Sequence, residues 1–290
     1  MLLPRTRRLA SIGGAAALVL AGLNVATGPV EAAPAWAPAG TAKIRPGVQM
    51  YTDGAQCTGN FVFADRAGNV YVGYAAHCAG TGTATETDGC DAKSLPTGTK
   101  VRFAGDGNLV SAGTTVGRGR LVYSSWLAMQ RLDTKRSNVC AYNDFALVRV
   151  GDRHVNKVNP TVPFWGGPIG LSRNGSAAGD DVFSYGNSSL RGGIEQLSPK
   201  QGTSLGSAGN GWTHSVYTLT PGIPGDSGSA FLDAQGRALG VLSTLAIAPI
   251  PASNGVGDLS RELAFAREHS GIAGLHLVKG TKAFASTPLT

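Results

Sequence analysis

Short apolar runs separated by glycine-containing turns are the feature that most restricts how this chain can fold. Forty-two of the 290 residues are glycine. Because they follow no fixed period, they indicate many turns rather than a collagen-like repeat or long helices. The strand-like runs are 60–65, 69–77, 100–105, 119–125, 144–150, 182–186, 214–220, 229–233 and 238–245. Regular short strands with glycine-rich turns predict an all-β sandwich or barrel.

The connections between these runs divide into tight turns and longer loops. The sequences DRAGN (65–69) and DAQGR (233–237) are typical of hairpin turns, since each offers a glycine for a positive φ. Two polar segments rich in glycine and serine, 174–181 and 201–211, are predicted to be loops.

One segment has a helical rather than a strand-like period. In 258–271 the apolar residues recur near helical spacing. Asp258 or Ser260 is available as the N-cap, and Gly271 is suited to end the helix. We therefore predict one amphipathic helix near the C-terminus.

The first 32 residues have the three-part pattern of a secretory signal peptide. Three arginines occur among residues 1–8, an apolar run covers 11–23, and small residues follow at 30–35, with cleavage expected after Ala32. A membrane anchor is the alternative, but the apolar run is shorter than the roughly 20 residues that a bilayer requires. We predict a secreted, extracellular protein without a membrane partner.

The charge left after this cleavage is moderate and positive. Of 25 basic and 18 acidic residues, the signal segment holds three arginines and one glutamate, which leaves 22 and 17 and a net charge of +5. The basic residues are scattered along the sequence, apart from small groups at 118–120 and 131–136. No basic stretch alternates with aromatic residues, as nucleic-acid binding favours, so no nucleic-acid partner is predicted.

Four cysteines occur in this exported chain: Cys57, Cys78, Cys90 and Cys140. In an oxidising compartment they predict two disulfides, and the sequence alone permits three pairings. No CxxC pair is present, so we predict no zinc site. No other metal and no cofactor is predicted.

Three separate segments contain residue types that together could activate a serine. Ser227 lies between glycines in PGIPGDSGSAF, His77 follows an apolar run in YAAHC, and Asp144 opens one in YNDFALVRV. Taken singly, each has an ordinary explanation: a turn serine, a core histidine and a surface carboxylate. Four histidines (His154, His214, His269 and His276) and four tryptophans (Trp36, Trp126, Trp165 and Trp212) are predicted to have packing or surface roles only.

The motifs AAHC, DFALV and GDSGS, in this order, resemble those of the trypsin-like (chymotrypsin-type) serine peptidases, most closely the secreted actinobacterial branch. The resemblance covers roughly residues 56–270. The order His–Asp–Ser fits this family and differs from that of subtilisins and α/β-hydrolases. One departure is that GDSGS has Ser229 where the family has glycine.

The resemblance implies an architecture of two antiparallel six-stranded β-barrels with the active site between them and a C-terminal helix. The expected divisions are a signal peptide at 1–32 and an N-terminal extension or short activation segment at 33–50. The first barrel is expected at 51–160, and the second, with the helix, at 161–290.

The resemblance also implies a role for each residue of the motifs. His77 would act as general base, Asp144 would orient it, and Ser227 would form the acyl-enzyme. The backbone N–H groups of Gly225 and Ser227 would form the oxyanion hole. Asp226 would be buried and salt-bridged, with a partner that the sequence does not reveal.

For substrate binding, the resemblance implies that Ser243 supports the aspartate and that Ser243, Thr244 and Leu245 pair with the substrate backbone. Pro221 stands where enzymes that cleave after Lys or Arg have an acid, and Gly255 would line the pocket wall. A narrow, uncharged pocket for small or apolar side chains is expected. The implied disulfide beside the histidine is Cys57–Cys78, with Cys90–Cys140 as the remaining pair.

These expectations predict a monomeric, secreted serine endopeptidase that acts on polypeptides, with proteinaceous inhibitors as further partners. Two alternatives remain open. One is a binding module that keeps the fold without turnover, and the other is a hydrolase of small esters.

Overall fold

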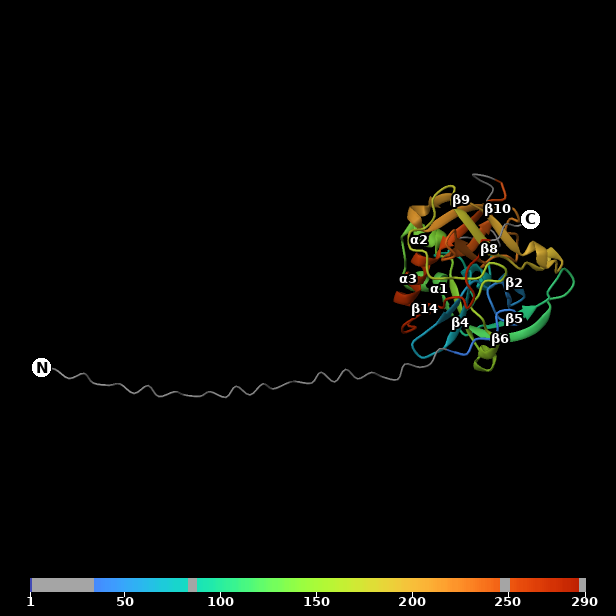
Figure 1. Ribbon diagram of the computed structural model, residues 1–290, viewed down its shortest axis with the longest axis horizontal. Coiled ribbons are helices and arrows are strands. Elements are labelled where there is room, and N and C mark those ends of the chain that lie inside the picture. Colours follow the sequence, from blue (N-terminus) through green and yellow to red (C-terminus); the bar gives the residue numbers. More distant parts are fainter. Residues whose placement is uncertain (2–33, 83–87, 246–250, 287–290) are drawn as a thin grey trace. The chain divides into compact units, whose positions relative to one another are not determined.

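Short, largely buried strands organise the chain into two antiparallel sheets (Figure 1). The computed structural model describes Met1 and residues 34–82, 88–245 and 251–286. The predicted signal peptide, apart from Met1, lies outside the described residues. Within the described part, no helix is both long and apolar enough to cross a bilayer.

The first sheet has eight strands in the order β14-β3-β4-β7-β6-β5-β1-β2. Its strands are β1 (Gln49–Thr52), β2 (Ala55–Thr58), β3 (Val62–Ala64), β4 (Val70–Tyr74), β5 (Lys100–Gly105), β6 (Thr114–Ser124), β7 (Ala146–Val150) and β14 (His276–Leu277). The turn at 65–69 joins β3 to β4 as predicted, with Gly68 at φ +76°. Because β14 pairs with β3, the chain returns to this sheet near its C-terminus.

The second sheet is a closed six-stranded barrel in the order β10-β13-β12-β11-β8-β9. Its strands are β8 (Asp181–Tyr185), β9 (Pro199–Ala208), β10 (Thr213–Thr218), β11 (Ala230–Asp233), β12 (Ala238–Leu245) and β13 (Asn254–Asp258). The prediction of a six-stranded barrel is thus confirmed for this half. The first half is one sheet of eight strands, extended by β14 and by the β1–β2 hairpin, and its closure into a barrel stays a prediction.

In the residues that the structure describes, three short α-helices and several 3₁₀ turns connect the strands. They are α1 (Ser125–Arg131), α2 (Ser137–Tyr142), α3 (Leu259–His269), η1 (Ala76–Ala79), η2 (Asp152–Lys157), η3 (Ser189–Arg191), η4 (Glu195–Leu197) and η5 (Gly209–Gly211). α3 is the predicted helix, and Asp258 caps it by accepting a hydrogen bond from the N–H of Arg261. No sequence pattern predicts α1 and α2, because each is at most two turns long and neither has a side-chain N-cap.

The prediction of a loop at 201–211 is wrong, since most of this segment belongs to β9. Its backbone pairs with β8 on one side and with β10 on the other. Backbone pairing requires no apolar side chains, and a Cβ at Gly202 would collide with the carbonyl of Tyr217. The close approach of two strands therefore explains the glycine that looked like a loop signal.

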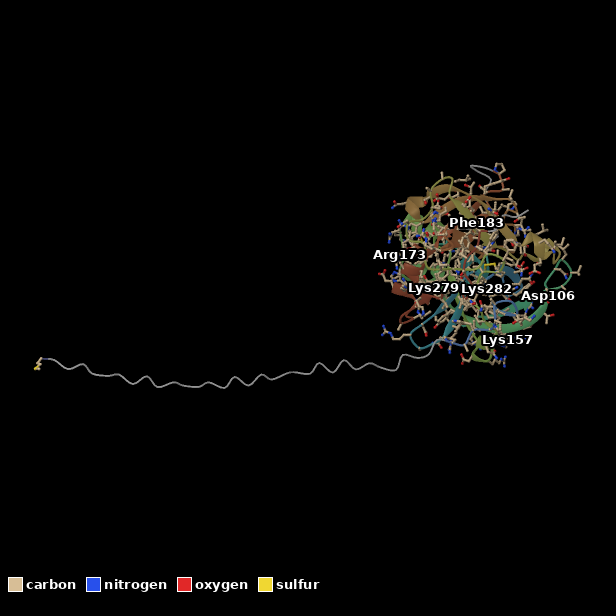
Figure 2. All side chains as sticks on the ribbon, in the orientation of Figure 1. Asp106, Lys157, Arg173, Phe183, Lys279 and Lys282 are labelled. Atoms are coloured by element: carbon tan, nitrogen blue, oxygen red, sulfur yellow. A yellow bond between two sulfur atoms is a disulfide. The ribbon has the colours of Figure 1, made fainter. Side chains whose placement is uncertain are left out.

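The interior is continuous between the two halves. One cluster of buried apolar residues runs from strands of the first sheet into Phe183 and Leu232 of the barrel, and Figure 2 shows Phe183 among the packed side chains. A smaller cluster fills the barrel itself: Val182, Val216, Phe231, Leu239, Leu242 and Val256. This shared core fixes the ends of β4 and β7 relative to the turn between 221 and 229.

Candidate active site

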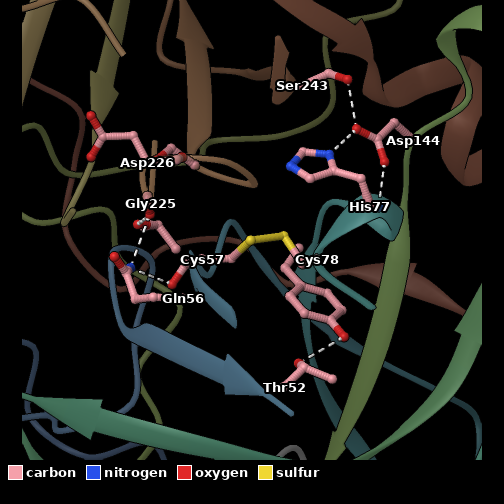
Figure 3. The surroundings of a disulfide bond; sticks show 12 residues. Thr52, Gln56, Cys57, His77, Cys78, Asp144, Gly225, Asp226 and Ser243 are labelled. Carbon is pink, nitrogen blue, oxygen red and sulfur yellow. Dashed lines mark hydrogen bonds and ion pairs between the residues drawn. A yellow bond between two sulfur atoms is a disulfide. The ribbon is translucent and has the colours of Figure 1, made fainter. Parts of the chain in front are cut away.

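Asp144 lies two residues before the start of β7 and accepts hydrogen bonds from three donors (Figure 3). The backbone N–H of His77 donates to Oδ1 at 2.8 Å. The Nδ1 of His77 and the Oγ of Ser243 each lie 2.6 Å from Oδ2. Burial alone would raise the pKa of Asp144, but the charge of His77 and these hydrogen bonds outweigh it and hold the pKa below its usual value. Asp144 is therefore a buried carboxylate.

His77 is fixed by its backbone as well as by its ring. It lies in η1, directly after the fully buried strand β4, and its neighbour Cys78 is bonded to Cys57 (Figure 3). Burial of the ring opposes protonation, but the charge of Asp144 and its hydrogen bond outweigh this and raise the pKa of His77. The side chain is still 29% exposed, so a base oriented by a carboxylate remains accessible.

The turn that carries Ser227 depends on two glycines in the left-handed region. Gly225 has φ +92° and Gly228 has φ +88°, which L side chains rarely adopt. A Cβ on Gly225 would collide with Oε1 of Gln56, and one on Gly228 would press against the carbonyl of Thr58. Within the described ranges, the N–H groups of Gly225 and Ser227 have no hydrogen-bond partner. Two neighbouring free donors are what an oxyanion-binding site requires.

The partner of Asp226 is a pair of basic side chains. Nη2 of Arg191 lies 2.6 Å and Nζ of Lys200 lies 3.1 Å from its Oδ2, and the backbone N–H of Ser188 donates to Oδ1. Burial lowers the pKa of the fully buried Lys200 to about 8, although the charge of Asp226 partly offsets this. Breaking such a buried pair typically costs about 3–5 kcal/mol. This cluster therefore holds the turn around Ser227 in one shape.

Ser229, where the sequence departs from the family pattern, is satisfied inside the same turn. Its Oγ donates to the carbonyl oxygen of Asp226 at 2.5 Å, and the residue is fully buried. Because the added hydroxyl points back into the turn, the departure leaves the outer face of Ser227 unchanged.

His77 and Ser227 line one cavity of about 560 Å³. The Nε2 of His77 and the Oγ of Ser227 have no hydrogen-bond partner among the described residues. The bond between a base and its nucleophile is often long before a substrate binds. Of the described residues that line the cavity, none is Asp, Glu, Lys or Arg.

The predicted substrate-binding residues are only partly at this cavity. Residues 243–245 line it, whereas Pro221 and Gly255 do not, and their neighbours Gly222 and Asn254 do. The buried side chain of Asn254 accepts from the N–H of Gly222 and donates to its carbonyl oxygen. A neutral amide thus joins the two walls of the cavity.

Glu262 is a buried residue of the site that the sequence analysis missed. It lies on α3, is fully buried, and accepts a hydrogen bond from the N–H of Asp144 at 3.1 Å through Oε1. Its Oε2 has no hydrogen-bond partner within the described residues. Burial and the nearby charges of Asp144 and Asp258 raise its pKa well above the usual value. Its place on the apolar face, three residues after Leu259 and four before Ala266, is the sequence signal that could have revealed it.

The four cysteines form the disulfides Cys57–Cys78 and Cys90–Cys140, as the resemblance implied. Two groups of ligand-type side chains occur in the described part of the chain, one around Cys57, His77 and Cys78 and one around Cys90 and Cys140. Both include disulfide sulfurs, which are not the thiolates that bind metals.

Comparisons with known proteins give structural matches alone. No family model matches the chain, and no curated protein sequence matches it. Among solved structures, protease A of Thermobifida fusca is 17% identical, with a TM-score of 0.49 over 82% of this chain and 99% of that chain. A Nocardiopsis protease is 19% identical, with a TM-score of 0.46 over 81% and 98%. A chymotrypsin of Cellulomonas bogoriensis is 16% identical, with a TM-score of 0.47 over 81% and 98%.

The chain resembles actinobacterial chymotrypsin-like serine proteases. At these identities and TM-scores the likeness carries no functional argument. The assignment of a function therefore depends on the chemistry of the residues around Ser227.

Proposed function

We propose that this protein is a secreted serine endopeptidase that cleaves peptide bonds through an acyl-enzyme. One observation carries the proposal: the Nδ1 of His77 is bound by a buried carboxylate, while its Nε2 has no partner among the described residues and its ring shares a cavity with Ser227. A base that acts on a serine hydroxyl needs to be oriented by a third group and to keep a ring nitrogen free for the proton.

In the proposed reaction, the Oγ of Ser227 attacks the substrate carbonyl carbon while its proton passes to Nε2 of His77. Negative charge develops on the carbonyl oxygen, where the free N–H groups of Gly225 and Ser227 stabilise it. The protonated His77 then gives its proton to the leaving amine, and water hydrolyses the acyl-enzyme. Asp144 stays ionised and stabilises the imidazolium.

The exported setting of the proposal rests on the predicted signal peptide and the two disulfides, which suit an oxidising compartment. In this proposal residues 51–160 and 161–290 each supply one barrel of a monomer, and 33–50 precede them. The uncharged cavity supports a preference for small or apolar side chains at the cleaved bond.

Mapping cleavage sites in a denatured protein mixture by mass spectrometry tests this proposal. We expect cleavage after small or apolar residues by the secreted protein, and none by Ser227→Ala. Cleavage mainly after Lys or Arg would contradict the pocket assignment. The absence of any cleavage by the folded protein would contradict the peptidase assignment.

The Oγ of Ser227 has no hydrogen-bond partner among the described residues. This observation also fits a protein that binds polypeptides without cleaving them. A hydrolase that prefers small esters would use the same residues. Turnover of a peptide amide and of its matching ester separates these cases, because a peptidase cleaves both, an esterase cleaves the ester alone, and a binding module cleaves neither.

A further inference from the structure

A second hollow, of about 690 Å³, lies on the first sheet and is lined by residues of β5, β6, β7 and the start of η2. It lies at the opposite end of β7 from Asp144. At about 3.3 Å per residue, positions 144 and 149 are separated by roughly 16 Å along the strand. The hollow is therefore separate from the cavity beside Ser227.

Basic residues that are scattered in the sequence lie together in this hollow. Its cationic lining residues are Lys100, Arg118, Arg120, Arg149 and Arg153, and its one acidic lining residue is Asp152. Their net charge of +4 compares with +5 for the whole chain after the predicted cleavage. Figure 2 shows another cation, Lys157, at the same lower edge of the molecule at which Figure 1 shows β6.

Three of these cations form a row across neighbouring strands. Lys100 is directly opposite Arg120, Arg120 is directly opposite Arg149, and all three are exposed. Like charges directly opposite each other destabilise a sheet. The nearby Arg149–Asp152 pair is exposed on both sides, so it compensates little. The folded chain thus keeps a repulsion that a bound anion would relieve.

Most side-chain hydrogen-bond donors of the cations that line the hollow have no partner among the described residues. In the described part of the chain, Lys100 and Arg118 make no side-chain hydrogen bond or ion pair, and Arg120 donates only to the carbonyl oxygen of Gly98. Partial burial and the charges of Lys157, Arg153 and Arg118 lower the pKa of His154, which lines the same hollow. Because these charges act on the ring, its pKa should respond to an anion bound in the hollow.

We propose that this hollow binds a linear chain of phosphate groups. Guanidinium groups match phosphate oxygens with paired hydrogen bonds, and successive phosphates of one chain would face the row of cations across β5, β6 and β7. No Phe, Tyr or Trp lines the hollow in the described residues. Because bases need aromatic faces for stacking, a base-free phosphate chain is favoured over single-stranded nucleic acid.

Calorimetric titration with inorganic polyphosphate at several salt concentrations tests the site. The variant Lys100→Gln/Arg120→Gln/Arg149→Gln should bind at least tenfold more weakly. The negative slope of log K against log salt should become shallower by about 2–3. The control Arg66→Gln/Lys93→Gln/Arg173→Gln removes the same charge from exposed positions elsewhere and should bind like the unchanged protein. Equal weakening in both variants would overturn the proposal.

Two further measurements sharpen this test. Polyphosphate should raise the pKa of His154, as followed by NMR, and an unchanged pKa would contradict binding in this hollow. A single-stranded oligodeoxynucleotide that bound more tightly than polyphosphate of equal charge would overturn the choice of a base-free ligand. Because removing the row relieves repulsion, the triple variant should melt no lower than the unchanged protein, so its loss of binding cannot come from unfolding.

Discussion

Two histidine–aspartate pairs occur in the described part of this molecule, and they have different surroundings. The Nδ1 of His77 lies 2.6 Å from Asp144, and the Nε2 of His214 lies 2.9 Å from Asp258. Each pair also has a serine hydroxyl close by: Ser243 bonds to Asp144, and Ser207 lies 2.9 Å from the Nδ1 of His214. The residue types alone therefore do not distinguish a site from a structural contact.

Access to the second ring nitrogen distinguishes the pairs. The Nε2 of His77 has no partner among the described residues, and the side chain is 29% exposed. Both nitrogens of His214 are bonded, and its side chain is 1% exposed. Since Asp258 also caps α3, the second pair joins β10 to the start of that helix. A base must be able to take up a proton, and only His77 is placed to do so.

The largest expected effect comes from removing the residues of the proposed reaction. Ser227→Ala and His77→Ala should each lower kcat by about 10⁴–10⁶-fold, because the two act as one unit. His214→Ala should leave kcat per folded molecule within a few-fold of the value for the unchanged protein. Steady-state kinetics on protein of measured folded fraction checks this. A loss in folded His214→Ala equal to that in His77→Ala would remove the distinction between the pairs.

Removing the charge of Asp144 should have the next largest effect. We expect Asp144→Asn to lower kcat by about 10³–10⁴-fold, because the imidazolium loses its counter-charge and the ring its orientation. Since neutral His77 is the proposed base and its pKa is raised, activity should rise with pH through a midpoint above 6.5. Asp144→Asn should move that midpoint down.

The matched change Asp258→Asn should leave this midpoint in place, as a pH profile of kcat/KM would show. A midpoint that moves equally in both variants would mean that the pH profile does not report His77.

Replacing the two histidines should affect stability in the opposite order from activity. His214→Ala leaves Asp258 buried without its partner, so it should lower the free energy of unfolding by about 3–5 kcal/mol. His77→Ala should cost less, because its side chain is partly exposed and opens on a cavity. Denaturant titration of both variants measures the difference. A smaller loss for His214→Ala than for His77→Ala would contradict a structural role for the second pair.

The smallest effect is expected at Glu262. Glu262→Gln keeps an acceptor for the N–H of Asp144 and should change kcat little, whereas Glu262→Leu removes the acceptor. The lost hydrogen bond has a net value of about 1 kcal/mol, so kcat should fall about fivefold in the leucine variant. Equal activity of the two variants would show that Glu262 does not position Asp144.

Glu262 should also affect how stability depends on pH. Its pKa in the folded state is raised, so its contribution to stability is complete below about 4.5 and is lost as pH rises toward the folded-state pKa. Glu262→Gln should flatten this part of the curve of unfolding free energy against pH. A curve of unchanged slope would indicate that Glu262 is not buried as a neutral acid.

The sequence reveals those parts of the site that are encoded locally. Neighbouring glycines, apolar runs and a cysteine mark His77, Asp144 and Ser227 as candidates for the proposed site. The position of Glu262 on the apolar face of α3 can indicate its burial, but no local pattern can indicate its contact with Asp144, 118 positions away. Arg191 and Lys200 were missed for the same reason, and β9 was missed because two neighbouring strands, rather than its own side chains, hold it in the barrel.

Covalent labelling with a fluorophosphonate tests most directly whether His77 activates Ser227. We expect one adduct, on the peptide that contains Ser227. It should form at a similar rate in the unchanged protein and in folded His214→Ala, and at least about 10³-fold more slowly in His77→Ala. Labelling of Ser227 at the same rate with and without the ring of His77, or an adduct on another serine, would contradict this activation.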